Sequence, residues 1–239
     1  MIRHTLSLLF FIAATVAAQE PAKAVRETLL EGPQQVGLKV RMEGPYTAEV
    51  PLQVVCYFRY SEAGVKKMAG APVELDKHLG GAIASLRERG DFPGDELETL
   101  LITPPKGSIP AKALLLIGLG DEANLSQALM ERVGKTALRQ AARLSARKVA
   151  FAPLIRDQGN TRFSTGDVET AVVRGLLLAY DSERRMQKEA LAGDYQLEEW
   201  WIEAGPAYYD ETVAGVKKAI AEAGTLIKAR PAGPLLKTK

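Results

Sequence analysis

The feature that most constrains this chain is its alternation of short apolar runs with longer amphipathic segments. Apolar runs of strand length occur at 36–42, 50–60, 99–103, 113–119, 148–154 and 197–204. Apolar residues recur at helical spacing at 75–89, 125–144, 168–180 and 208–227. Strands that alternate with helices form an α/β domain. We therefore predict a mixed, largely parallel sheet flanked by helices on both faces.

Both ends of the chain depart from this pattern. Residues 1–18 are predicted to form a signal peptide, because an apolar run ends in small residues before an expected cleavage between Ala18 and Gln19. This run is shorter than the roughly 20 residues of a membrane span. We therefore expect a secreted or periplasmic protein with no stable membrane insertion after cleavage. Residues 19–35 predict a flexible lead-in, 36–228 the domain and 229–239 a disordered tail.

Composition argues against several kinds of site. The formal net charge is only +2 and no long basic block occurs, so nucleic acid is not an expected partner. Cys56 is the only cysteine and lies in an apolar run, where we expect a buried strand residue without a disulfide. The predicted mature chain adds only His78 to the histidine and cysteine ligands, so no metal site of that kind and no cofactor is expected. A Ser/His/Asp arrangement would need His78, for which we expect a structural role.

Two glycine motifs imitate phosphate-binding sequences. The segment from Gly118 to Ala123 fits the G-x-G-x-x-A dinucleotide pattern, but Asp121 and Glu122 would repel a pyrophosphate. We interpret it as a strand-to-helix turn. The segment 133–136 resembles the end of a phosphate-binding loop but lacks the earlier glycine and lies inside an amphipathic pattern.

Gly80 and Gly81 interrupt the apolar pattern of 75–89. Each glycine inside a helix costs about 1 kcal/mol relative to alanine, so we expect a close contact there. One interpretation is packing of the helix on the sheet. The alternative is approach to a ligand phosphate, which makes Gly80 and Gly81 candidate ligand-binding residues.

Several separated blocks resemble the N-terminal domain of the leucyl aminopeptidase family. They are Leu75-Asp76-Lys77-His78-Leu79-Gly80-Gly81-Ala82-Ile83, the runs 90–94 and 98–101, Leu115 to Gly120, 149–151 and 173–180. The resemblance is strongest over 50–185. It implies a fold like that of macro domains, and for this domain a role in oligomerisation and in shaping access to the active site. Nucleotide binding of the macro type would follow from the same likeness, but Asn124 and Asn160 do not form the asparagine-rich loop of ADP-ribose binders.

The same resemblance implies that no catalytic residues are present. In the family, a metal pair is held by a lysine and carboxylates of the C-terminal domain, around the sequence Asn-Thr-Asp-Ala-Glu-Gly-Arg-Leu, which does not occur in this sequence. We therefore expect a non-catalytic binding or assembly domain that pairs with itself or with an exported peptidase. The alternative is the non-catalytic part of a split metallo-aminopeptidase, active only with a separate catalytic chain.

Trp201 is the candidate interface residue. In an extended strand over 197–204, Glu199, Trp201 and Glu203 share one face, and Trp200 and Ile202 share the other. An indole between two glutamates suits an interface anchor. The alternative is that the last helix covers Trp201.

Overall fold

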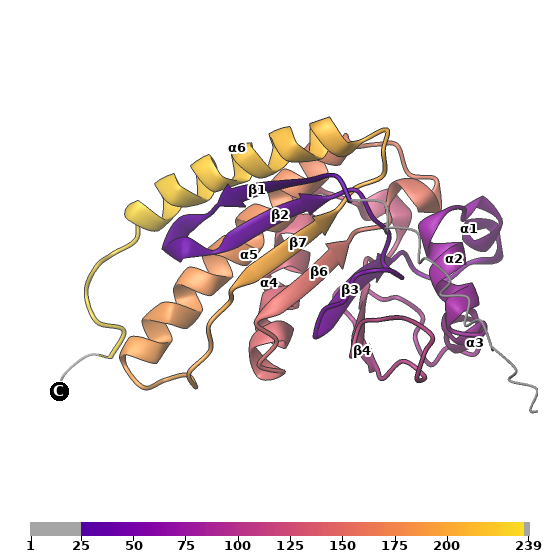
Figure 1. The fold of residues 1–239 in the computed structure, drawn as a ribbon, viewed down its shortest axis with the longest axis horizontal. Helices are drawn as coiled ribbons and strands as arrows, with labels where there is room; N and C mark the ends of the chain where they lie inside the picture. Colours follow the sequence, from indigo (N-terminus) through magenta and orange to yellow (C-terminus); the bar gives the residue numbers. More distant parts are fainter. Residues whose placement is uncertain (1–24, 237–239) are drawn as a thin grey trace, which may run out of the picture.

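The computed structural model describes residues 25–236, so the predicted signal peptide and its cleavage site lie outside the described residues. It has seven strands and six α-helices in this range (Figure 1). The strands are β1 (Glu27–Glu31), β2 (Gly37–Arg41), β3 (Leu52–Tyr57), β4 (Thr99–Ile102), β5 (Leu114–Gly118), β6 (Lys148–Ala152) and β7 (Glu199–Glu203). The helices are α1 (Glu62–Lys67), α2 (Ala71–His78), α3 (Ala82–Glu88), α4 (Gln127–Arg143), α5 (Thr165–Lys188) and α6 (Tyr209–Lys228).

The strands form one mixed sheet in the order β1-β2-β7-β6-β3-β5-β4. The five central strands are parallel, whereas β1 and β4 pair antiparallel at the two edges. Carboxyl ends of parallel strands meet at one edge of a sheet. Chain segments that follow β2, β6 and β7 are therefore brought together there, which confirms the predicted α/β class and creates the site described below.

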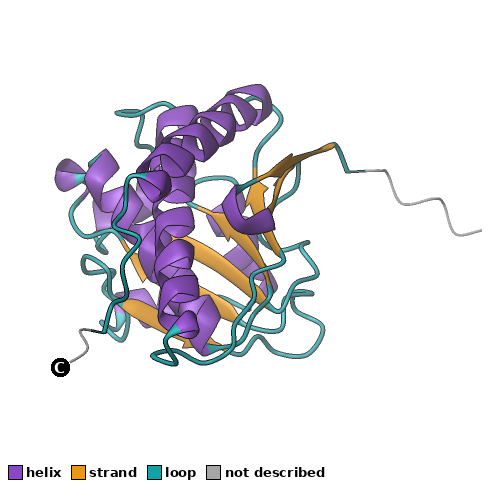
Figure 2. Cartoon of the chain, turned by 90° about the vertical axis from the view of Figure 1, so that its left-hand side faces the viewer, coloured by secondary structure: helices purple, strands orange, loops and turns teal. Residues whose placement is uncertain are grey.

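One face of the sheet is packed against α4, α5 and α6 (Figures 1 and 2). Trp200 and Phe151 are fully buried in this core. Helices α4 and α5 approach closely because each has a glycine at the crossing. A Cβ at Gly134 would lie 2.0 Å from the Val172 carbonyl oxygen, and one at Gly175 would lie 2.1 Å from that of Glu131. The glycine of the 133–136 motif is thus a helix-packing residue.

The opposite face has a smaller core beneath α2 and α3, which includes Leu75, Ile83 and Phe92. These helices lie beside β3 and β4, away from the β1 edge (Figure 1). At that edge Leu29 remains 64% exposed. Helices therefore flank both faces as predicted, but the second face is covered less at β1 and β2.

The lead-in predicted as flexible at 19–35 is partly ordered. Strand β1 lies within it and pairs with β2, which places Glu27 opposite Arg41. The prediction failed because β1 is a polar edge strand whose alternation is visible only through its partner. Residues 19–24 of the lead-in lie outside the described range.

The tail, predicted as disordered from residue 229, lies against α5 as far as Leu236. Arg230 forms an ion pair with the buried carboxylate of Asp181 at 2.6 Å. The amides of Leu235 and Leu236 donate to the Glu189 carboxylate. These contacts join the tail to residues distant in sequence, which the tail's own pattern does not indicate, and disorder of the tail stays a prediction.

Two helix predictions also need correction. The single helix expected at 75–89 is two helices, α2 and α3, joined at Gly80 and Gly81. Helix α4 begins after Ser126, whose hydroxyl accepts from the Leu129 amide, and not at the predicted Asn124 cap. By contrast, the predicted cap of α5 is confirmed, since Ser164 accepts from the Asp167 amide. Within residues 25–236, the longest apolar helical stretches fall short of what crossing a bilayer requires.

Candidate ligand cavity at the carboxyl edge of the sheet

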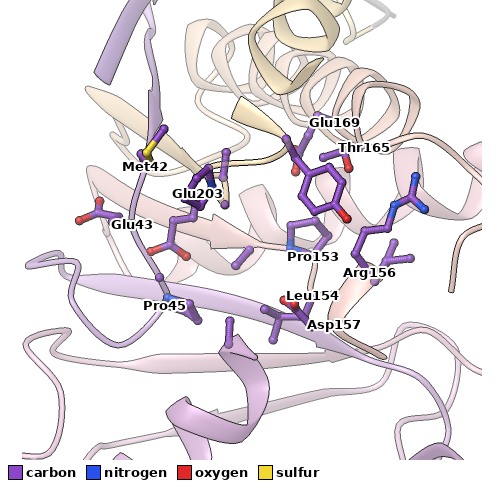
Figure 3. Close-up of a pocket in the computed structure, with 18 of the residues that line it drawn as sticks. Met42, Glu43, Pro45, Pro153, Leu154, Arg156, Asp157, Thr165, Glu169 and Glu203 are labelled. Carbon is purple, nitrogen blue, oxygen red and sulfur yellow. The ribbon is translucent and has the colours of Figure 1, made fainter. Parts of the chain in front are cut away.

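A cavity of about 680 Å³ opens at the carboxyl ends of β2, β6 and β7. Its walls come from the segments 42–46, 152–157 and 203–208 that follow these strands, and from the start of α5 (Figure 3). Val25, Arg26, Ala71 and Phe163 complete the lining. The volume is within the range of small-molecule sites, and the place is one where α/β sheets bind ligands.

Two buried carboxyl groups lie among the otherwise largely apolar lining residues. Glu203 ends β7 and is 7% exposed, and Glu169 lies in the first turns of α5 and is 1% exposed. Burial raises the pKa of Glu169 to about 8. Burial also raises the pKa of Glu203 well above its ordinary value, against the lowering effect of a hydrogen bond from Gln53 at 2.8 Å. Both groups therefore bind protons more tightly than an exposed glutamate does.

Two further acids come from the loops. Glu43 follows β2, and Asp157 lies in the loop after β6. Burial raises the pKa of each carboxyl, although the charge of Arg41 opposes the effect on Glu43. Arg41 lies 3.1 Å from Glu43, an ion-pair distance without hydrogen-bond geometry. Glu43 and Glu203 extend from the same side of the cavity, with Asp157 on its floor (Figure 3).

The loop from β6 to α5 is fixed by Gln158. Its buried amide donates to the carbonyls of Cys56 and Leu154 and accepts from the Phe58 amide. These bonds tie the loop to β3 and so position Arg156 and Asp157. The cavity wall is therefore held by buried hydrogen bonds.

Several polar atoms in this lining have no hydrogen-bond partner among residues 25–236. They are Oε1 of Glu43, Oε2 of Glu169, Oε1 of Glu203, Oγ1 of Thr165 and Nε of Arg156. Buried polar atoms are normally satisfied, and an unsatisfied one costs about 1–3 kcal/mol. A bound ligand or solvent that pairs with these atoms would remove that cost. Over the same residues, histidine, cysteine and acidic side chains form no group able to hold a metal ion.

Trp201 lies beside this site and was placed on the correct face. It is half-buried, while Trp200 is fully buried on the other side of the sheet. Its indole donates to Glu199 at 2.8 Å, and the Arg41 guanidinium lies 4.0 Å from the ring centroid. The alternative that the last helix covers it is wrong, because α6 packs with the core on the Trp200 side. Arg41 links Trp201 to the cavity through its ion pair with Glu43.

Gly80 and Gly81 are remote from the residues that line the cavity. Their φ angles are +66° and +83°, and a Cβ at either position would meet nothing within 4 Å. The interpretation as packing on the sheet is therefore wrong, whereas approach to a ligand phosphate stays a prediction. The glycines are needed because the turn between α2 and α3 requires left-handed backbone.

His78 and Cys56 have structural surroundings. His78 is exposed at the end of α2 and stacks on Tyr46, with ring centroids 5.1 Å apart. Cys56 is fully buried in β3, as predicted, and burial raises the pKa of its thiol.

The cavity acids themselves were missed. Glu169 stands on the same helical stripe as Val172, Val173 and Leu176, so its buried position could have been found from the spacing alone. Glu203 and Glu43 stand at the ends of predicted strands. Their convergence depends on the strand order, which the sequence pattern does not give.

Comparison with known proteins agrees with this fold. Residues 54–189 match the family described as cytosol aminopeptidase family, N-terminal domain. A protein described as "Probable cytosol aminopeptidase" from Geotalea uraniireducens is 29% identical over 192 residues, which is 79% of this chain and 36% of that protein. Another from Alkaliphilus oremlandii is 33% identical over 96 residues, covering 40% of this chain and 19% of that protein. The chain thus spans about a third or less of these relatives.

Solved structures show the same fold at low identity. Tomato leucine aminopeptidase superposes with a TM-score of 0.56 at 16% identity, over 85% of this chain and 38% of that one. A macrodomain of Oceanobacillus iheyensis gives 0.56 at 9% identity, over 85% and 98% of the two chains. The macro-domain-like fold inferred from the resemblance is confirmed. With the match over 54–189, the chain belongs to the cytosol aminopeptidase family, as a representative of its N-terminal domain.

Proposed function

We propose that this chain is an exported, non-catalytic binding domain whose ligand occupies the cavity at the carboxyl edge. The observation that carries the proposal is the set of buried, unpaired polar atoms around a volume of about 680 Å³. A cavity that served only packing would be expected to be apolar. Export rests on the pattern of the first 18 residues.

The family match supports the non-catalytic part of the proposal. The matching region is the N-terminal domain, and the metal-binding signature that the family resemblance implies for the catalytic domain does not occur in the sequence. The cavity acids are dispersed around a volume and, in residues 25–236, form no group that could hold a metal, whereas a metal pair needs oxygen ligands that converge. Binding is therefore the activity that these residues support.

Nucleotide binding is a weaker fit to the lining. An Oceanobacillus iheyensis macrodomain solved with ADP shares this fold, with a TM-score of 0.55 at 10% identity, over 84% of this chain and 100% of that one. In this chain, however, four acidic residues line the cavity, and their charge would disfavour a diphosphate.

Two measurements test the proposal. Thermal unfolding of the purified protein should shift upward with a cavity ligand and should not do so when Glu169 and Glu203 are both replaced by Gln. Hydrolysis of a leucyl amide substrate, with manganese or zinc supplied, should stay at the background rate. Turnover that a chelator abolishes would contradict the non-catalytic assignment.

A second candidate is assembly with a separate catalytic chain or another copy. It is favoured by the half-buried Trp201 and the exposed Leu29 at the less covered end of the sheet. Trp201→Ala should then change the size-exclusion profile or abolish recovery of an exported peptidase partner. If the variant associates as the wild type does, the sheet face that carries Trp201 is not the interface.

A further inference from the structure

The charges around the cavity indicate the class of its ligand. We propose that the cavity binds a small organic cation carrying amine or guanidinium groups. This inference rests on the proposed binding function and deepens it. Four acidic side chains line the cavity, Glu43, Asp157, Glu169 and Glu203, against the two basic side chains Arg26 and Arg156.

Both arginines have other contacts. Arg26 forms an ion pair with Asp210 at 2.7 Å, and its guanidinium lies 4.1 Å from the Tyr209 ring centroid. The Arg156 guanidinium lies 5.7 Å from the centroid of the Tyr208 ring. Within the described chain, Nε of Arg156 has no hydrogen-bond partner, and Glu43, Glu169 and Glu203 each keep one carboxylate oxygen without a partner. The lining therefore offers more free acceptors than free donors.

The placement of these acceptors favours an extended cation over a metal ion. Glu203 ends β7 and Glu43 follows the neighbouring β2 on the same side of the cavity, whereas Glu169 comes from α5 (Figure 3). In residues 25–236 they do not gather into a group that could hold a metal. A molecule with several N–H donors can reach dispersed acceptors, whereas a divalent ion needs its ligands around one point.

An anion has less to bind at the start of α5. Helix N-termini attract anions through free backbone amides. In α5 the Gly166 amide donates to Glu211, and the Asp167 amide donates to the Ser164 hydroxyl. These donors are already used, and Glu169 adds a carboxyl to the same end of the helix.

Protonation of the acids makes binding pH-dependent. The charge of Glu169 acts on Cys56 of β3 and on Glu203 of β7, and Glu203 is also affected by the charges of Arg41 in β2 and of Glu43, which follows β2. Burial keeps Glu169 protonated up to about pH 8. A bound cation favours the ionised carboxylates, so binding releases protons and the affinity rises between pH 6 and pH 9. Asp157 and Arg156, in the loop after β6, also line the cavity and carry opposite charges.

Isothermal titration with spermidine and with agmatine tests this inference. The wild type should bind at least one of them, and Glu169→Gln and Glu203→Gln should each weaken that binding at least tenfold. Glu198→Gln is the matched control, because Glu198 is partly exposed and pairs with Arg147 away from the cavity. Heats measured in phosphate and in Tris should differ in the wild type, owing to proton release, and should differ less in the Gln variants. Circular dichroism checks that each variant is folded.

The same titrations with ADP-ribose and glucose separate the two proposals. Binding of ADP-ribose, strengthened in the Gln variants, would overturn the cation assignment and leave the binding function intact. Cation binding that is equal in wild type and variants would also overturn it, because the site would lie elsewhere. If none of these probes binds at millimolar concentration, both the cation assignment and the proposed function are contradicted.

Discussion

Glutamates in two regions of this molecule, one partly exposed and one buried, have opposite surroundings. Between the helices, Arg174 of α5 pairs with Glu131 of α4 at 2.9 Å and also with Glu222 of α6. Burial raises the pKa of Glu131, but hydrogen bonds from Lys135 and Arg174 outweigh it, so the net shift is downward. At the cavity, Glu169 lies in the same helix α5 without such partners, and its pKa is raised. The paired acid serves the fold, whereas the unpaired acid is available to a ligand.

The largest expected effect concerns the helix-covered face. Trp200→Ala removes a fully buried ring that packs near Phe151, so the free energy of unfolding should fall by about 3–5 kcal/mol. Trp201→Ala, one residue along on the other face, should cost less than about 2 kcal/mol because Trp201 is only half-buried. Urea unfolding of both variants measures the difference. Equal losses would show that the two faces contribute alike.

The next effect comes from the cavity acid. With an unfolded pKa of 4.5 and a folded pKa of about 8, Glu169 stays protonated in the folded state while the unfolded chain ionises. Stability should therefore fall as pH rises from 4.5 to 8, by up to about 1.4 kcal/mol per pH unit.

Glu169→Gln removes this titration, so the variant should gain stability relative to the wild type as pH rises toward 8. Urea unfolding at pH 5, 6.5 and 8 measures the trend. Parallel pH profiles for the two proteins would contradict the raised pKa.

A smaller effect is expected for the ion pairs that Arg174 forms between the helices. Arg174→Met should destabilise by about 1–2 kcal/mol, since it leaves Glu131 and Glu222 without their shared cation in a partly exposed site. The part of the loss that involves Glu131 should be fully present above its unfolded pKa and should fade as the pH falls through its lowered folded pKa, which is the reverse of the Glu169 trend. A constant loss across pH would show that the ion pairs contribute little.

The smallest effect concerns the turn between α2 and α3. Gly81→Ala should destabilise by about 1 kcal/mol, because alanine is strained at a φ of +83° even though its Cβ has open space. Gly224→Ala, inside α6 and equally open, should instead stabilise by roughly 0.5–1 kcal/mol. Thermal melting of the pair checks the opposite signs. A stabilising Gly81→Ala would show that the turn does not hold this conformation.

Local patterns predicted much of this fold. Strands β2 to β7 and helices α4 to α6 follow apolar periodicity, and the Ser164 cap follows from spacing. Strand β1 and helix α1 escaped prediction because their residues are largely polar or exposed and gain order from distant partners. Glu43, Glu169 and Glu203 all line the cavity, although Glu43 lies more than a hundred residues before the other two in the sequence. Only the strand order brings them together, so their joint role could not be predicted from periodicity.

Site-resolved titration of the glutamate side chains tests the central claim most directly. Carbon-13 NMR of the Cδ resonances, assigned with Glu169→Gln and Glu131→Gln, reports each carboxyl separately. We expect Glu169 to titrate near pH 8 and Glu131 to titrate below its ordinary value of 4.5. A common titration of both groups near pH 4.5 would contradict the distinction between a paired structural acid and an unpaired ligand-binding acid.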